Sequence, residues 1–600
     1  MERGQVSLRF PWESVLASAG LVAGARAAWI AGRDGYASIG LWNLAASSAS
    51  RHDLSLLLPV LLAAIVLAWL ARRTGPAGRG VLFVAGAALT FLLVIGHLFG
   101  PTFHAPGFHT SREKLAHAGA LAAALGSTAL LLSARRWSRA LARLAALGVG
   151  LLTLAALGIR IVRPVSSTRA KGPNVILISL DTVRADRLGC YGYPLATTPE
   201  IDRFFARSSV RFTRAMSPQP FTLTAHMSLF TGLVPQVHGV AVEQPLAQGV
   251  PTLPRLLAQA GYLTFGIADP IYWLAPRYGF SRGFHLYRQM YGTAAQRNDA
   301  LEPLLADLDD ERFFLFLHYY DAHSDHALTP YNARPEDQEL LAGWYHGSFS
   351  PTDDQGRWGT ARLWAMNEEG RTLEDPEDRR YLSSLYDAGL RTLDAALGDL
   401  FDLLEELGRT EDTIVVLTSD HGEEFFEHGR VLHTQLYQDT LHVPLLFRLP
   451  RKPARSTCAE LVSLVDVAPT VLDLVGIAPP AGLDGTSLAG LIRGGDGALD
   501  REQVVVGWEQ AGLLTGDWSL LPPGHGDPRW RLFHLASDPG ELRDLLSEGA
   551  PPPQGERLLE LARREGLRLA EQRERIGKAE PVPLEEKTVE ALRELGYAGE

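Results

Sequence analysis

Three continuous apolar runs, each followed directly by polar residues, constrain the fold of this chain more than any other feature. They are 175–180, 313–317 and 413–417, and polar residues follow at Asp181, at His318 to Asp321 and at Thr418 to His421. Such runs are typical of strands that are buried on both faces of a parallel sheet. Stretches with helical spacing lie between them, including 380–407. Alternating strands and helices predict an α/β fold, a mostly parallel sheet covered by helices.

Residues 1–165 have a different amino-acid composition, which is rich in Leu, Ala and Gly and poor in acidic residues. Several apolar runs there reach the roughly 18–20 residues that a bilayer crossing needs. The clear runs are 54–71, 81–99, 115–133 and 144–162, and a weaker run, 15–30, contains Arg26. A buried helical core is the alternative, but Arg-rich gaps between successive runs disfavour it. We therefore expect an all-α transmembrane region of about five spans and not a cleaved signal peptide.

The remaining chain divides into a short linker and two soluble parts. We expect a polar linker at 166–172, a catalytic domain at 173–500 and a smaller C-terminal subdomain with a helical tail at 501–600.

Arginines crowd the loops at 72–79 and 135–143, which should therefore be cytoplasmic. The chain after residue 172 is then extracytoplasmic, either periplasmic or extracellular, and the lipid bilayer is a partner.

Charge and cysteine content narrow the function classes. The net charge is -11 and no basic tract is present, so we expect no nucleic-acid partner. The two cysteines, Cys190 and Cys458, have no spacing that suits a metal site and build no disulfide framework. The sequence does not decide whether they form one disulfide with each other.

Two of the predicted strand ends carry residues that suit a metal ion. Asp181 follows the first apolar run, and Asp420 with His421 follows the third. Open parallel sheets place ligand sites at the carboxyl ends of their strands. Two carboxylates and one imidazole suit a single divalent cation, Ca, Mg or Mn, with Zn as a further option.

Thr222 stands at a predicted helix start between these two strand ends. Exposed backbone N–H groups at a helix start favour an anion, and His226 lies four residues on, on the same helix face. A threonine hydroxyl is a weak nucleophile until a base or a metal activates it. A threonine at a helix start is by itself typical of a helix cap, so a catalytic role depends on the flanking motif described below. In that role the hydroxyl would lie beside the metal, and His226 could donate to a bound anion.

Several segments together resemble the sulfatase branch of the alkaline phosphatase superfamily. The matching segments are 181–193, 418–424, 427–429, 442–446, 465–474 and 483–488. The resemblance extends from about Pro173 to the C-terminus. It implies the alkaline phosphatase fold, a metal-dependent ester hydrolase or phosphotransferase, and metal ligation by Asp181, Asp420 and His421.

Departures from the sulfatase pattern point away from sulfate esters. Thr222 stands where sulfatases carry the Cys or Ser that becomes formylglycine, and threonine cannot form that aldehyde. Thr182 replaces the second acid of the first motif, Thr224 replaces the motif proline and His226 the motif arginine. A Thr nucleophile behind a multi-span anchor is similar to lipoteichoic acid synthases and phosphoethanolamine transferases, which implies phosphate esters.

The resemblance also assigns two substrate contacts. His323 matches a family segment whose histidine contacts the substrate, and His433 falls where the family places a Lys or His against the transferred group. We therefore expect both side chains to contact the anionic part of the substrate, a phosphate or sulfate ester of a lipid or glycan.

Three alternatives stay open at this point. In a two-metal phosphodiesterase, Asp321, His323 or His326, and His433 would hold a second ion. A sulfuric ester hydrolase would keep the chemistry of the family. A non-catalytic membrane protein would only bind anionic glycans or lipids, but a complete ligand set with a hydroxyl argues against it.

Overall fold

The structure is a computed structural model that describes residues 170–583. It omits positions 171, 307, 309–310, 325–330, 332, 351–359, 496–498, 500–502, 525–527, 548 and 550. The five expected spans lie outside these described residues, as does most of the expected linker. Among the helices that are described, none has the combination of length and apolar character that a membrane crossing requires.

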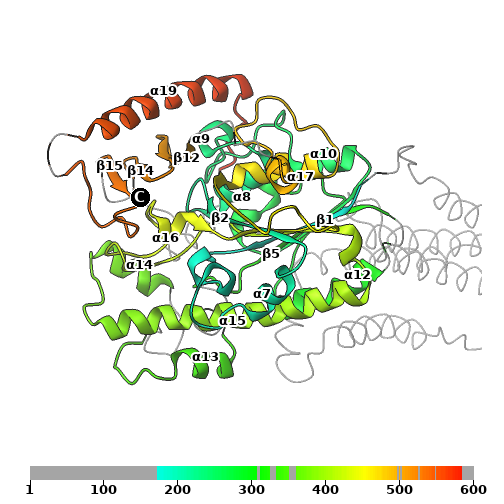
Figure 1. Cartoon of the computed structure of the whole chain (residues 1–600), viewed down its shortest axis with the longest axis horizontal. Coiled ribbons are helices and arrows are strands. Elements are labelled where there is room, and N and C mark those ends of the chain that lie inside the picture. Colours follow the sequence, from blue (N-terminus) through cyan, green and yellow to red (C-terminus); the bar gives the residue numbers. More distant parts are fainter. Residues whose placement is uncertain are drawn as a thin grey trace, which may run out of the picture. The chain divides into compact units, whose positions relative to one another are not determined.

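A nine-stranded, mostly parallel sheet forms the centre of the described part, as the sequence predicts (Figure 1). The order is β11-β2-β10-β6-β1-β5-β3-β4, and β9 pairs with β2. The strands are β1 (Asn174–Leu180), β2 (Ser209–Met216), β3 (Leu263–Ala268), β4 (Leu286–Gln289), β5 (Phe313–Tyr319), β6 (Thr413–Ser419), β9 (His442–Val443), β10 (Leu445–Arg448) and β11 (Thr457–Ser463). The three apolar runs become β1, β5 and β6, and β1 pairs in parallel with both of the others.

Alternate residues of β1 point into two separate apolar cores. Val175 and Leu177 pack in the core that also contains residues of α8 (Thr222–Thr231) and α17 (Val467–Leu474). Ile176 and Ile178 pack in the core beneath α7 (Pro199–Phe205) and α15 (Pro376–Glu406). The continuous apolar run therefore reflects burial on both faces.

The long helix α15 begins four residues before the predicted start at 380. Asp375 accepts a hydrogen bond from the Glu377 N–H at 2.8 Å, and Pro376 occupies the first turn. Both features favour a helix N-terminus at this point, so the predicted boundary is wrong because it followed only the leucine spacing.

The C-terminal subdomain is a second, antiparallel sheet covered by a helix. Its strands are β12 (Val504–Val506), β13 (Gly512–Leu514), β14 (Trp518–Leu521) and β15 (Arg531–His534), in that order. The helix α19 (Pro553–Ile576) packs on it through Leu558 and Ala562. β15 lies at one edge of this sheet.

Shorter elements connect these layers. They are α9 (Pro235–His238), α10 (Leu253–Gln259), α11 (Ala294–Asp299), α12 (Glu302–Ala306), α13 (Pro335–Ala342), α14 (Thr360–Glu368), α16 (Gln438–Leu441), α18 (Ala489–Ile492) and the ribbon β7 (Glu424–Phe425) with β8 (Val431–Leu432). The acidic, Trp-dotted stretch around 325–375 contributes α13 and α14, and α13 packs against α15.

Candidate active site at the carboxyl ends of β1 and β6

The three predicted metal ligands come together at one edge of the sheet. Asp181 follows β1, while Asp420 and His421 follow β6, and all three are fully buried. One potential ligand atom from each lies within 4.8 Å of the others. Parallel pairing of β1 with β6 brings the two strand ends side by side, which is why residues so distant in sequence meet here.

The Asp420 carboxylate has one oxygen held by the backbone and one that no hydrogen bond reaches. Its Oδ1 accepts from the N–H groups of His421 at 2.9 Å and of Thr182 at 3.2 Å. Its Oδ2 takes no hydrogen bond within the described residues and lies 3.3 Å from His421 Nε2 and 3.5 Å from His226 Nδ1. A buried oxygen oriented in this way fits a metal ligand, so the donor set suits a divalent cation.

Thr182 adopts a strained backbone conformation directly after Asp181. Its φ is +59°, a left-handed value that is unfavourable for a β-branched residue. This conformation directs its N–H to Asp420, while its hydroxyl donates to the carbonyls of Asp181 and Ala322. The residue that replaces the second acid of the sulfatase motif thus serves to hold the two strand ends together.

Thr222 is the first residue of α8 and lies against the metal-ligand group. Its hydroxyl oxygen is 3.3 Å from His421 Nε2, and the residue is 3% exposed. His421 Nδ1 is 3.0 Å from the Gly422 carbonyl, which assigns the proton to Nδ1 and leaves the Nε2 lone pair facing Thr222. Burial lowers the pKa of His421 to about 4, so the ring is neutral at pH 7.

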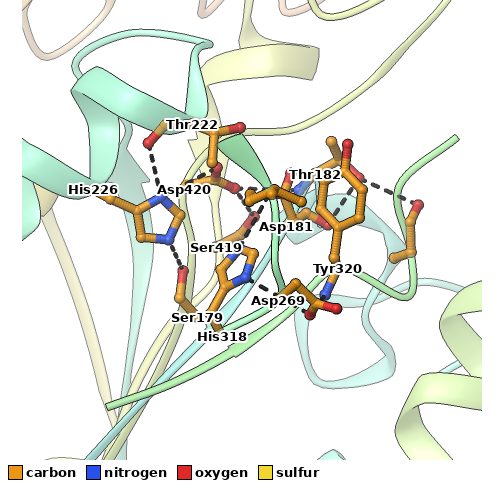
Figure 2. A network of polar contacts seen from close by, with 12 residues as sticks. Ser179, Asp181, Thr182, Thr222, His226, Asp269, His318, Tyr320, Ser419 and Asp420 are labelled. Atoms are coloured by element: carbon orange, nitrogen blue, oxygen red, sulfur yellow. Dashed lines mark hydrogen bonds and ion pairs between the residues drawn. The ribbon is translucent and has the colours of Figure 1, made fainter. Parts of the chain in front are cut away.

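His226 is fully buried behind Thr222, and both ring nitrogens contact protein groups (Figure 2). Nδ1 donates to the Thr222 carbonyl at 2.8 Å, and Nε2 accepts from the Ser179 hydroxyl at 2.9 Å. Burial lowers the pKa of this ring to about 4. The expected contact of His226 with an anion would require one of these two hydrogen bonds to be exchanged.

The two expected substrate histidines lie next to His421. The rings of His421 and His433 are 4.5 Å apart between centroids, and those of His323 and His433 are 5.2 Å apart. His433 Nδ1 is 3.1 Å from Glu423 Oε2, and Tyr320 stacks on His323 at 4.2 Å. The structure therefore brings both side chains to the metal-ligand group. Their substrate contacts stay a prediction.

His318 is a residue of this site that the sequence analysis did not assign. It lies in β5, is fully buried, and its Nε2 is 3.1 Å from Asp181 Oδ2 (Figure 2). Its Nδ1 lies 3.9 Å from Asp269 Oδ2, and Asp269 pairs with Arg297 at 2.5 Å. The sequence feature that could have identified this site residue is its position as the first polar residue after the second apolar run.

Fold and site together place a buried group of two carboxylates and one imidazole at the edge of a mostly parallel α/β sheet, with a hydroxyl beside it. The sequence model described as Sulfatase matches residues 173–477, half of the chain. A second model, N-sulphoglucosamine sulphohydrolase, C-terminal, matches residues 426–558. The chain belongs to the sulfatase family, whose members are metal-dependent ester hydrolases of the alkaline phosphatase superfamily.

Relatives of this chain include sulfatases. An N-acetylglucosamine-6-O-sulfatase of Bacteroides thetaiotaomicron is 22% identical over 68% of this chain and 89% of its own length. Arylsulfatase K of Mus musculus is 33% identical over 31% of this chain and 36% of its own length.

Solved structures share the fold. One, in complex with its substrate D-glucosamine-2-N,6-O-disulfate, is 20% identical with a TM-score of 0.53, covering 67% of this chain and 99% of its own. The phosphonate monoester hydrolase of Agrobacterium radiobacter is 18% identical with a TM-score of 0.53, covering 69% of this chain and all of its own.

Proposed function

We propose that this protein is a metal-dependent hydrolase or transferase of phosphate esters, with Thr222 as a covalent nucleophile. One observation carries the proposal: the buried Thr222 hydroxyl lies 3.3 Å from His421 Nε2, beside the group formed by Asp181, Asp420 and His421. A hydroxyl in this position is oriented toward the ligand set that would activate it.

The side chains of the site have separate roles in this proposal. Asp181, Asp420 and His421 hold one divalent ion, which when bound acts as a Lewis acid. The Thr222 oxygen forms a bond to phosphorus while the bond from phosphorus to the leaving alcohol breaks. His323 and His433 contact the anionic oxygens. Water or an acceptor alcohol then cleaves the phosphothreonine.

The structure supports a more indirect role for His226 than a substrate contact. Its Nδ1–H donates a hydrogen bond to the Thr222 carbonyl, and its Nε2 accepts one from the Ser179 hydroxyl. We therefore propose that His226 positions the first turn of α8. The anion contact inferred from the helix spacing is the less favoured role.

Hydrolysis of sulfate esters is the second candidate, because named relatives are sulfatases. Against it stands Thr222, since a threonine cannot form the aldehyde hydrate of sulfatases. A phosphonate monoester hydrolase among the fold neighbours is compatible with either chemistry. The substrate class, a phosphorylated or sulfated glycan or lipid, is part of the proposal.

Activity profiling of the full-length protein tests this choice. Aryl phosphate, aryl phosphodiester, aryl phosphonate and aryl sulfate would be compared, and the intermediate trapped by rapid acid quench for mass spectrometry. We expect a phosphorus ester to be preferred and the mass of a phosphoryl or phosphoester group on Thr222. Preferred turnover of aryl sulfate, with sulfate on Thr222, would favour the sulfatase alternative.

The two-metal alternative loses support from the surroundings of Asp321. Its Oδ1 accepts from the Ala294 N–H at 2.7 Å, and its Oδ2 pairs with Arg297. Both oxygens already have partners, so a second ion would have to displace the arginine. His326 lies outside the described residues. Elemental analysis giving one ion per chain is expected, and two ions would restore this alternative.

Membrane anchoring and an extracytoplasmic site are also part of the proposal. Their support is the series of apolar runs before residue 165 and the Arg-rich loops between them. A reporter that is active only in the cytoplasm, fused after Lys171, is expected to be silent. Strong activity of that reporter would overturn the topology.

A further inference from the structure

A cavity of about 830 Å³ lies between the main sheet and the C-terminal sheet. Residues of β2, α16, the β13–β14 turn and segment 535–542 line it, and none of the expected site residues does. Cavities of this size commonly hold small organic molecules. The cavity therefore raises the question of which ligand chemistry its walls would accept.

Asp439 is the most unusual residue of the cavity wall. Its side chain is 5% exposed, and neither carboxylate oxygen has a hydrogen-bond partner within the described residues. The nearby His428 Nε2 is 3.9 Å away, and burial lowers the pKa of that ring to about 4, so it is neutral at pH 7. Burial also raises the pKa of the Asp439 carboxyl. A buried carboxylate without donors is costly, so this group needs a proton or a cation.

The cationic side chains of the wall donate their hydrogen bonds to other groups, although the Arg184 guanidinium also attracts the Asp439 carboxylate electrostatically. Arg184 pairs with Asp186 and Glu427, and it also donates to a backbone carbonyl. Arg214 donates to the carbonyls of residues 515 and 516. A second buried carboxylate, Glu541, also lines the cavity. The cavity therefore has an excess of hydrogen-bond acceptors, which favours a cationic donor over an anion.

A metal ion fits this wall less well than an ammonium group. Within the described part of the chain, only Asp181, Asp420 and His421 bring three ligand atoms within 4.8 Å of one another. An ammonium group carries three N–H donors and tolerates looser geometry than a metal. Apolar side chains, Met216, Leu461 and Leu514, also line the cavity and suit a short carbon chain.

We propose that this cavity binds a small organic molecule carrying a primary ammonium group, which donates its hydrogen bonds to Asp439. Charge-assisted hydrogen bonds of this kind are about twice as strong as neutral ones. The ligand would satisfy the buried carboxylate, and its carbon chain would cover the apolar wall. This site is separate from the proposed catalytic centre and does not depend on its chemistry.

Thermal unfolding of the full-length protein with three probes at pH 7.5 tests the proposal. n-Butylammonium carries the charge and the N–H donors, n-butanol lacks the charge, and tetramethylammonium lacks the N–H donors. We expect n-butylammonium alone to raise the Tm in a saturable manner. Asp439→Asn is expected to weaken its binding at least about tenfold, whereas Asp517→Asn, an exposed residue of the rim, is expected to leave it intact.

Three results would overturn the proposal. One is no Tm shift with n-butylammonium, another is an equal shift with either control probe, and the third is unchanged binding by Asp439→Asn. If Asp439→Asn does not fold, the comparison of the three probes on the unsubstituted protein decides the question, because it needs no variant.

Discussion

Asp420 and Asp439 are both buried carboxylates on loops and short elements after β6, but their surroundings differ. Asp420 Oδ1 is held by two backbone N–H groups, and its Oδ2 faces two imidazoles. Asp439 has no hydrogen bond to either oxygen within the described residues and faces a cavity. Backbone N–H groups therefore orient the Asp420 carboxylate. Among the described residues, no donor orients the Asp439 carboxylate.

The difference arises because parallel pairing brings the carboxyl ends of two strands side by side. Pairing of β1 with β6 brings Asp181 against Asp420 and His421, so three ligand atoms converge. Asp439 lies in α16, a helix of four residues at the boundary with the C-terminal sheet, and among the described residues it belongs to no group of three potential ligands. Similar residue types thus lead to two different proposals, a metal ion at the strand ends and an organic cation at the domain boundary.

The largest expected effect is a loss of bound metal and activity, which we expect for a substitution of Asp420 but not of Asp439. Asp420→Ala should lose the bound ion and nearly all activity, because a buried ligand with an oriented oxygen disappears. Asp439→Asn should keep the ion. Elemental analysis and turnover of the purified variants measure both effects. Equal metal loss in the two variants would show that the contrast between them is wrong.

Removal of the attacking oxygen should have the next largest effect. Thr222→Ala is expected to lower kcat on the order of 10³-fold or more, as for other catalytic nucleophiles. Thr222→Ser should keep measurable activity, since the hydroxyl survives. Thr224→Ala, two residues on in the same helix, is the control and should change the rate far less. A wild-type rate in Thr222→Ala would rule out the covalent mechanism.

His318 should affect the metal site without contacting the substrate. Its Nε2–H donates to Asp181 Oδ2, so His318→Leu should weaken metal binding by about 10–100-fold, as substitutions behind metal ligands do. His318→Gln keeps an N–H donor and should recover part of that loss. Titration with Mn²⁺ measures the affinity, and equal affinities in both variants would remove His318 from this role.

The smallest expected effect is a pH dependence at the domain boundary. Burial raises the pKa of Glu541 from 4.5 to about 7. The folded state then keeps a proton that the unfolded state releases, so this group makes stability fall as pH rises from about 4.5 to 7. Glu541→Gln should remove about 3 kcal/mol of this pH-dependent loss of stability. Thermal melting across this pH range measures it, and an unchanged slope would contradict the assigned pKa.

Much of the strand-end site could be predicted from local sequence. The apolar runs identified β1, β5 and β6, and the residue type at each strand end identified Asp181, Asp420 and His421. Thr222 followed from its place in the sulfatase-like motif, and the structure puts it at the first residue of α8. The strands and the grouping of these side chains are confirmed because a buried strand has a recognisable composition and because parallel strands bring their carboxyl ends to one edge. The roles of the side chains in metal binding and catalysis stay predictions.

The tertiary structure decided which partners these side chains have. The contact of His318 with Asp181 joins different strands, and the bond of His226 to Ser179 joins α8 to β1, so neither has a local signal. The cavity beside Asp439 depends on how the C-terminal sheet packs on β2 and α16. Local sequence determined strands, helix starts and chemical groups. Distances between residues far apart in the chain depend on packing, and only the folded chain specifies them.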